Sequence, residues 1–186
     1  MLNQADGLTL CRYARACIRT ALGGLPAKPP EGSQFHFDGA CFVTLYRGDE
    51  LHGCIGSLEA HQPLLSDVAD NSVSAALRDP RNTPLDLGDE QKLRVEVSLL
   101  SPLTRLPVRS RAEAIAALRP GQDGVVLRYH GRRGTFLPQV WEELPEPPEF
   151  WRHLLRKAGL PTDFDSPELE VYRYTVDKWI EEPQSQ

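Results

Sequence analysis

A stretch with two glycines around a cysteine, Leu51-His52-Gly53-Cys54-Ile55-Gly56-Ser57, constrains the fold of this chain more than any other. It follows residues 41–46, which are rich in strand formers, after a short glycine-containing turn. The pattern predicts a hairpin of two antiparallel strands with the cysteine on the second. Because strand side chains alternate, we expect Cys54 and His52 on one face and Ile55 on the other.

Two interpretations of Cys54 are open at this point. Free cysteine is among the most buried residue types and often packs as a small hydrophobic side chain. The flanking glycines, however, leave backbone accessible to a ligand or to another chain. A cation beside the thiol would favour the reactive thiolate, and His52 is two residues away.

Composition limits the class of protein. The chain has 186 residues, which fits a single domain with approximate lobes 1–100 and 101–186. A net charge of -5 makes nucleic-acid binding an unlikely function. The four cysteines form no Cys-x-x-Cys pair, so we predict no metal site and no cofactor, and expect reduced thiols in the cytoplasm. We expect no secretory signal and no membrane span.

Periodicity predicts an alternation of helices and strands. Asp6 is the expected N-cap of the first helix, and the tail 181–186 is expected to fray. Helices are predicted at 6–22, 64–77, 111–118 and 150–158, with a short one opening at Pro138, and further strands at 93–100, 124–129, 132–137 and 169–176. This arrangement is an α+β fold dominated by antiparallel pairing.

The hairpin has a second occurrence in the chain. Residues 43–48 and 53–55 correspond to residues 126–131 and 134–136, each pair being a strand, a Tyr-x-Gly turn and a glycine-bearing strand. The match is either chance or an internal repeat, and a repeat would make Thr135 the pseudo-equivalent of Cys54.

Five segments resemble, in order, the motifs of the AMMECR domain family, whose prokaryotic members include AmmeMemoRadiSam system protein A. They are Leu51-His52-Gly53-Cys54-Ile55-Gly56, Ala75-Ala76 with Asp79-Pro80-Arg81, Val95 to Ser101, Gly131 to Trp141, and His153 to Leu160. The resemblance implies two β3α2-like repeats that share one mostly antiparallel, barrel-like sheet with flanking helices. It also implies association with a Memo-type protein and a radical SAM enzyme. His52 stands where the family signature has arginine, so a switchable charge replaces a permanent one.

Other candidates for chemistry carry charge. Glu96 lies in the middle of a predicted strand, where it is either a structural ion-pair partner or a general base. Arg81, Arg132 and Arg133 are either ordinary surface charges or the holders of a carboxylate or phosphate. With Thr135 and His52 they form the predicted binding set, and Cys54 and Glu96 form the predicted catalytic pair.

Two hypotheses about function follow. In the first, the protein is an enzyme or enzyme component, with Cys54 in a cleft between the two repeats, that acts on a small anionic or nucleotide-like substrate. In the second, the same groove serves a non-catalytic adaptor that binds a peptide or partner protein. The sequence specifies neither the substrate nor the oligomeric state.

Overall fold

The computed structural model describes residues 2–183 and divides into two compact units. The first unit contains the residues up to Leu100 together with those from Asp177 onward, and the second contains Ser101–Val176. The expected second lobe, 101–186, includes residues 177–186, whereas the described part of that segment belongs to the first unit. The reason is a last strand that returns to the first sheet.

The sheet of the first unit has four strands in the order β2-β1-β3-β8. Strands β1 (Ala40–Arg47) and β2 (Glu50–Gly56) form the predicted hairpin, and β3 (Leu93–Leu100) pairs antiparallel with β1. Strand β8 (Val176–Glu181) completes the sheet. Alternate residues of β1 and β3 are fully buried, so one face of the sheet is the core face.

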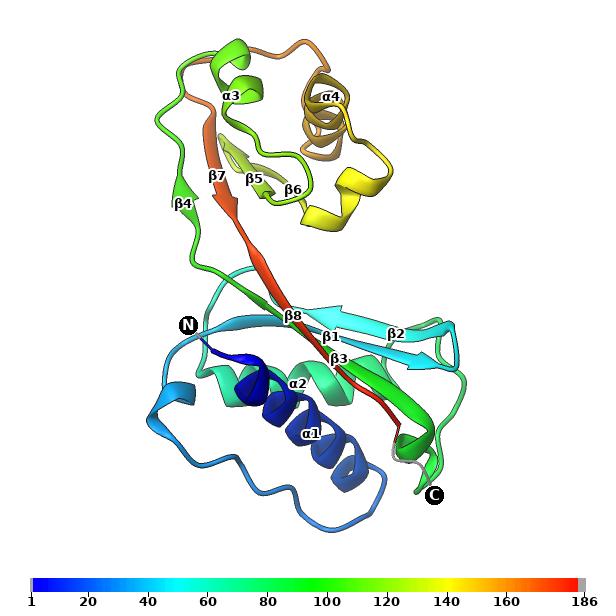
Figure 1. The fold of residues 1–186 in the computed structure, drawn as a ribbon. Helices are drawn as coiled ribbons and strands as arrows, with labels where there is room; N and C mark the ends of the chain where they lie inside the picture. The colour runs from blue at the N-terminus through cyan, green and yellow to red at the C-terminus, as the bar shows by residue number, and fades with distance from the viewer. Residues whose placement is uncertain (1, 184–186) are drawn as a thin grey trace. The chain divides into compact units, whose positions relative to one another are not determined.

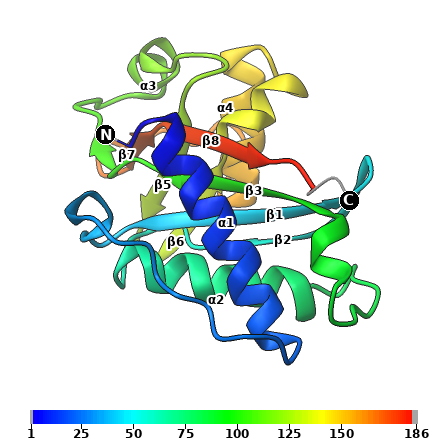
Figure 2. The same ribbon diagram turned by 60° about the horizontal axis from the view of Figure 1, so that its bottom comes forward.

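Two helices cover that core face, α1 (Gln4–Ala21) and α2 (Leu64–Leu77) (Figures 1 and 2). The N-cap of α1 is Asn3, and Asp6 occupies the third helical position of a capping box in which each side chain accepts from the other's backbone N–H. The core between the helices and the sheet includes Leu10, Ile18, Val43, Leu45, Val68, Val95, Val97 and Trp179.

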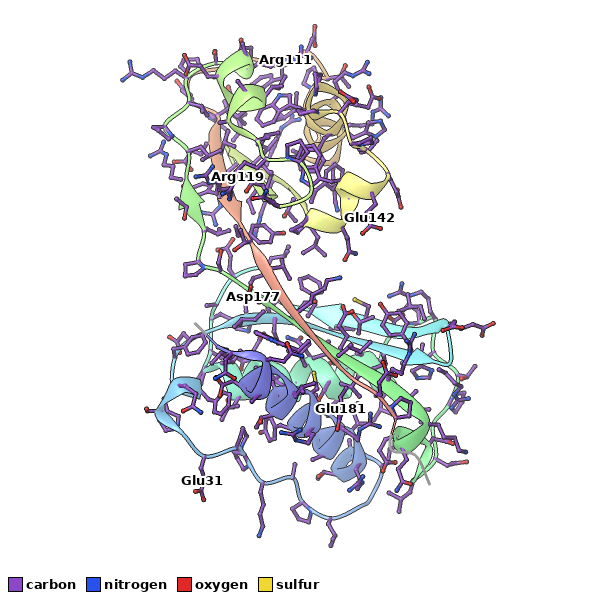
Figure 3. All side chains as sticks on the ribbon, viewed as in Figure 1. Glu31, Arg111, Arg119, Glu142, Asp177 and Glu181 are labelled. Atoms are coloured by element: carbon purple, nitrogen blue, oxygen red, sulfur yellow. The ribbon has the colours of Figure 1, made fainter. Side chains whose placement is uncertain are left out.

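A buried ion pair fixes β8 to α1. Arg15 is 2% exposed, and its Nε donates to Glu181 Oε2 at 3.1 Å. The same guanidinium donates to the backbone carbonyls of Glu90 and Leu93. Figure 3 shows Glu181 beside α1. The expectation that the tail frays from residue 181 is therefore wrong at Glu181, and residues 184–186 lie outside the described residues.

The second unit has its own four-stranded sheet, in the order β4-β7-β5-β6. Its strands are β4 (Thr104–Arg105), β5 (Gly124–Tyr129), β6 (Arg132–Phe136) and β7 (Glu170–Tyr174). The β5–β6 connection is a two-residue turn in which His130 and Gly131 both have positive φ, of 44° and 79°. Such a turn matches the right-handed twist of a hairpin.

Helices α3 (Arg111–Ala117) and α4 (Pro147–Lys157) pack with this sheet around a second core. Helix α4 begins three residues earlier than predicted. Prolines are tolerated at its first positions, because the first backbone N–H groups of an α-helix have no hydrogen-bond partner within the helix. Three short 3₁₀ turns complete the structure, η1 (Ser33–Phe35), η2 (Asp89–Lys92) and η3 (Pro138–Glu142).

The observed class is α+β, with two antiparallel sheets and four α-helices in residues 2–183. Two separate sheets stand in place of the single barrel-like sheet that the resemblance implies, and the described strands close no barrel. Common descent of the two hairpins stays a prediction. None of the helices within residues 2–183 is long and apolar enough to cross a membrane.

Candidate functional site

A row of polar side chains crosses the helix-free face of the first sheet. Thr44 on β1 lies opposite Cys54 on β2 and opposite Glu96 on β3. The Thr44 hydroxyl donates to Cys54 Sγ at 3.3 Å, and Lys178 Nζ of β8 lies 3.6 Å from Glu96 Oε1. Cys54 is partly exposed and Thr44 is 7% exposed. The row therefore presents a thiol, a hydroxyl, a carboxylate and an ammonium group side by side.

The loop after α2 holds the backbone of Cys54. Asp79 Oδ2 accepts from the Cys54 N–H at 2.9 Å, and Arg81 Nε donates to Asp79 Oδ1 at 2.8 Å. Arg81 Nη2 is 3.5 Å from the Cys54 carbonyl oxygen. The Arg81 guanidinium, together with the Cys54 N–H, holds the pKa of Asp79 well below its ordinary value. Arg81 of the predicted binding set therefore lies beside the Cys54 backbone.

A second pair extends the polar face towards the hairpin turn. The Arg94 guanidinium carbon lies 5.3 Å from the centre of the Tyr46 ring, and the two residues are opposite each other on β3 and β1. Burial raises the pKa of the Tyr46 phenol, with further contributions from the charges of Glu96 and Cys54. Tyr46 and Arg94 therefore belong to the same electrostatic environment as the cysteine.

His52 does not lie beside Cys54 on this face, so that expectation is wrong. The register changes between Leu45 and Tyr46, which pair with Gly53 and Leu51, and His52 is the extra residue of a β-bulge. Its imidazole is 6% exposed and hydrogen-bonds to the backbone of Ala76 in α2. A bulge turns the side chain that would otherwise follow the alternation, so a thiolate–imidazolium pair is not formed.

Cys54 differs from the other three cysteines. Cys11, Cys17 and Cys41 are buried, and burial raises the pKa of all three thiols, that of Cys11 to about 12. The Cys11 thiol donates to the Trp179 carbonyl oxygen at 3.2 Å. Of the two interpretations of Cys54, packing in the apolar core does not fit its place on the helix-free face.

The remaining predicted site residues lie in the second unit. Arg132 and Arg133 line an open hollow of about 440 Å³ at the end of the β5–β6 hairpin, together with Arg128, His130 and Glu168. The Arg132 guanidinium donates to the Gly159 carbonyl, and His130 Nε2 lies 2.6 Å from Glu168 Oε2. Thr135 is partly buried near Tyr174. The grouping of these residues with Arg81 and Cys54 stays a prediction.

Sequence reasoning missed five residues of the first-unit site. They are Thr44, Tyr46, Asp79, Arg94 and Lys178. A signal existed for three of them, because Thr44 and Tyr46 alternate with the apolar residues of β1 and Arg94 is two residues from Glu96. Asp79 is part of the Asp79-Pro80-Arg81 motif, but its contact with Cys54 is made through a loop, and Lys178 comes from the last strand. No local pattern indicates either of these contacts.

Comparisons with known proteins match most of the chain. The family model described as AMMECR1 matches residues 11–179. Protein MJ0810 of Methanocaldococcus jannaschii is 36% identical over 181 residues, which cover 94% of this chain and 89% of that protein. A Thermotoga maritima protein is 36% identical over 140 residues, 74% of this chain and 75% of that protein. The crystal structure of protein PH0010 from Pyrococcus horikoshii superimposes with a TM-score of 0.82 at 30% identity, covering 100% of this chain and 96% of that one.

Proposed function

The chain belongs to the AMMECR1 family, and we propose that it is an enzyme, or the catalytic component of one, that uses the Cys54 thiol as a nucleophile. The observation that carries the proposal is the place of Cys54, which is the partly exposed cysteine on the polar face and accepts a hydrogen bond from Thr44. A hydroxyl that donates to sulfur stabilises the thiolate, which is the nucleophilic form.

The proposed reaction is transfer of a group through a covalent adduct. The Cys54 thiol first loses its proton to water, and the thiolate sulfur then forms a bond to an electrophilic carbon of the substrate while the leaving group departs with the electron pair of the bond that breaks. A second nucleophile, water or a hydroxyl group, then forms a bond to the same carbon, and the C–S bond breaks with its electron pair returning to the sulfur. One strand, β1, lies between the strands of Cys54 and Glu96, so the two residues are two strand spacings apart, a distance of about 10 Å. Glu96 is therefore too far away to deprotonate the sulfur directly. Its proposed role is to accept a proton from the second nucleophile, in the step that releases the adduct.

Cations around the row support a small anionic substrate, which includes nucleotide-like compounds. The Arg81 side chain is 55% exposed and that of Lys178 is 48% exposed, so both can reach a bound molecule while they keep their carboxylate partners. Arg94 adds a third cation, stacked on Tyr46. Such chemistry needs a reduced thiol, which suits the cytoplasm.

The test is selective alkylation of the native protein with iodoacetamide at neutral pH, followed by intact mass and peptide mapping. We expect one equivalent on Cys54 and none on the three buried cysteines, whose thiols have raised pKa values. Cys54→Ser is the control and takes up no label. If Cys54 is labelled only after unfolding, the enzyme proposal is wrong and the alternative, an adaptor that binds a peptide or partner protein, takes its place.

The partners implied by family resemblance, a Memo-type protein and a radical SAM enzyme, are part of this proposal. The support for them is family membership alone. Mixing each purified partner with this protein should slow alkylation of Cys54 if the partner binds over the polar face. An unchanged rate together with no co-elution on gel filtration would remove that partner from the proposal.

We further propose that the hollow of the second unit binds an anion. Its basic residues are held in place, Arg132 by the Gly159 carbonyl and Arg128 by the Tyr172 ring, 4.9 Å away. Titration with inorganic phosphate, followed by NMR, should shift the backbone amides of residues 128–133. Arg132→Ala and Arg133→Ala should each weaken that shift. A shift as large as that of the wild type in both variants would contradict the assignment.

A further inference from the structure

The end of α2 and the loop after it contact three consecutive residues of β2. The His52 imidazole hydrogen-bonds to the Ala76 backbone, and the Cys54 N–H donates to Asp79 Oδ2. Between them, Gly53 lies so close to the Ala75 carbonyl oxygen that an added Cβ would be 2.1 Å from it. We call these interactions the α2–β2 contact. It fixes the backbone from which the Cys54 thiol projects.

The His52 imidazole suits this contact only in its neutral form. One ring nitrogen is used by the hydrogen bond to Ala76, and Nε2 is buried with no partner in residues 2–183. When the neutral ring carries its hydrogen on Nδ1, which donates to the Ala76 carbonyl, Nε2 carries a lone pair and no hydrogen. Protonation would add both a buried N–H without an acceptor and a buried charge, and each of these opposes burial.

The charged groups that act on the ring come from three segments. Arg47 of β1 opposes protonation of His52, while Asp79 after α2 and Asp89 of η2 favour it. Burial is the largest influence, and it lowers the pKa of His52 below the ordinary 6.5. The hydrogen bond to the Ala76 backbone also favours the protonated ring, and together with the two carboxylates it does not offset the loss of hydration.

We propose that His52 makes the α2–β2 contact depend on pH, so that a proton on the imidazole opens the contact and releases the Cys54 backbone from Asp79. The opening itself is a property of the fold. That it would switch off a reaction at Cys54 rests on the proposed function.

The direction follows from the two protonation equilibria. In the open form His52 titrates near its ordinary value of 6.5, and in the closed form it titrates lower. Above about pH 6.5 both forms are neutral, and the contact is at its most stable. As the pH falls below that value, the open form takes up the proton first, and opening becomes up to about tenfold more favourable for each pH unit until the closed form also titrates.

The experiment is hydrogen exchange at the Cys54 amide, measured by NMR across this pH range in the wild type and in His52→Gln. The intrinsic exchange rate cancels in the ratio of the wild-type exchange rate to that of His52→Gln. The ratio should rise on acidification by up to about tenfold per pH unit. His61→Gln removes an exposed histidine and is the matched control, which should follow the wild type. An identical pH profile in wild type and His52→Gln would overturn the inference.

Direct titration of the wild type covers the case in which the variant does not fold. The His52 ring signal should titrate below pH 6.5, the ordinary value for a histidine. If it titrates at or above that value, His52 has no control over the contact. Alkylation of Cys54 at neutral pH tests the proposed function separately. If Cys54 resists alkylation in the native protein while exchange of its amide still depends on His52, the inference holds and the proposed function fails.

Discussion

The indole of Trp179 lies directly against the Cα of Gly7, and a Cβ built on that glycine would come within 2.0 Å of the ring carbons. Gly7 is in the first turns of α1, and Trp179 is in β8. The helix thus has glycine at a position where alanine would ordinarily be preferred, because the last strand needs the space.

Gly7→Ala should therefore destabilise the protein. The gain in helix propensity is about 1 kcal/mol, and we expect overpacking against Trp179 to exceed it, for a net loss of about 1–2 kcal/mol in the free energy of unfolding. Urea denaturation measures the change. In a double-mutant cycle, Trp179→Ala should remove the penalty, and a stabilised Gly7→Ala protein would show that the indole moves away at little cost.

Loss of the buried Arg15 charge should destabilise the protein more strongly. Arg15→Met leaves the Glu181 carboxylate and two backbone carbonyls without their donor, for an expected loss of about 3–5 kcal/mol. Glu181→Gln keeps an acceptor and should cost less. Denaturant unfolding of both variants gives the comparison, and equal losses would indicate that the backbone carbonyls contribute little.

Removal of the Thr44 hydroxyl should slow alkylation of Cys54. A hydrogen bond of this kind is worth about 0.5–1.5 kcal/mol, which corresponds to a rate lower by about two- to tenfold in Thr44→Val. The reaction with iodoacetamide at fixed neutral pH measures the rate. Thr104→Val, an exposed threonine in the second unit, is the control. An unchanged rate in Thr44→Val would mean that this hydrogen bond does not activate the sulfur.

Asp79 should give the protein a characteristic acid sensitivity. Its folded pKa is depressed by Arg81 and by the Cys54 N–H, so its stabilising contribution is complete above the unfolded value of about 3.9 and is lost as the pH falls from there through the folded pKa. Asp79→Asn should be less stable at neutral pH and should lose less stability between pH values of about 4 and 2. Thermal unfolding across that range measures it, with the exposed Asp38→Asn as reference.

Local patterns predicted the helices and strands that can be recognised from their own residues, without knowledge of the segments that pack against them. Helix α2 and strand β3 have the predicted bounds, because helical spacing and strict alternation are visible within each segment. Strand β8 was missed, since it is short and charged and its strand partner β3 is far away in the sequence. The side of His52 was wrong for a related reason, because one inserted residue in the pairing reverses an alternation that the sequence alone would continue.

The same distinction holds for the candidate site. Cys54, Glu96 and Arg81 were found from residue type and motif, and all three lie in the first unit. Thr44 and Lys178 join them only through strand register. Register depends on contacts between distant segments, which a single sequence does not display.

The return of β8 to the first sheet sets an order for assembly during synthesis. Residues 101–176 are continuous and leave the ribosome before the strand that contributes Lys178, Trp179 and Glu181. Since domains generally fold as units while the chain is being made, the second unit has time to form first, whereas α1 waits for the partners of Gly7 and Arg15. A nascent chain stalled before residue 176 would expose the surface of α1 on which Trp179 packs, and this is where a chaperone would be needed.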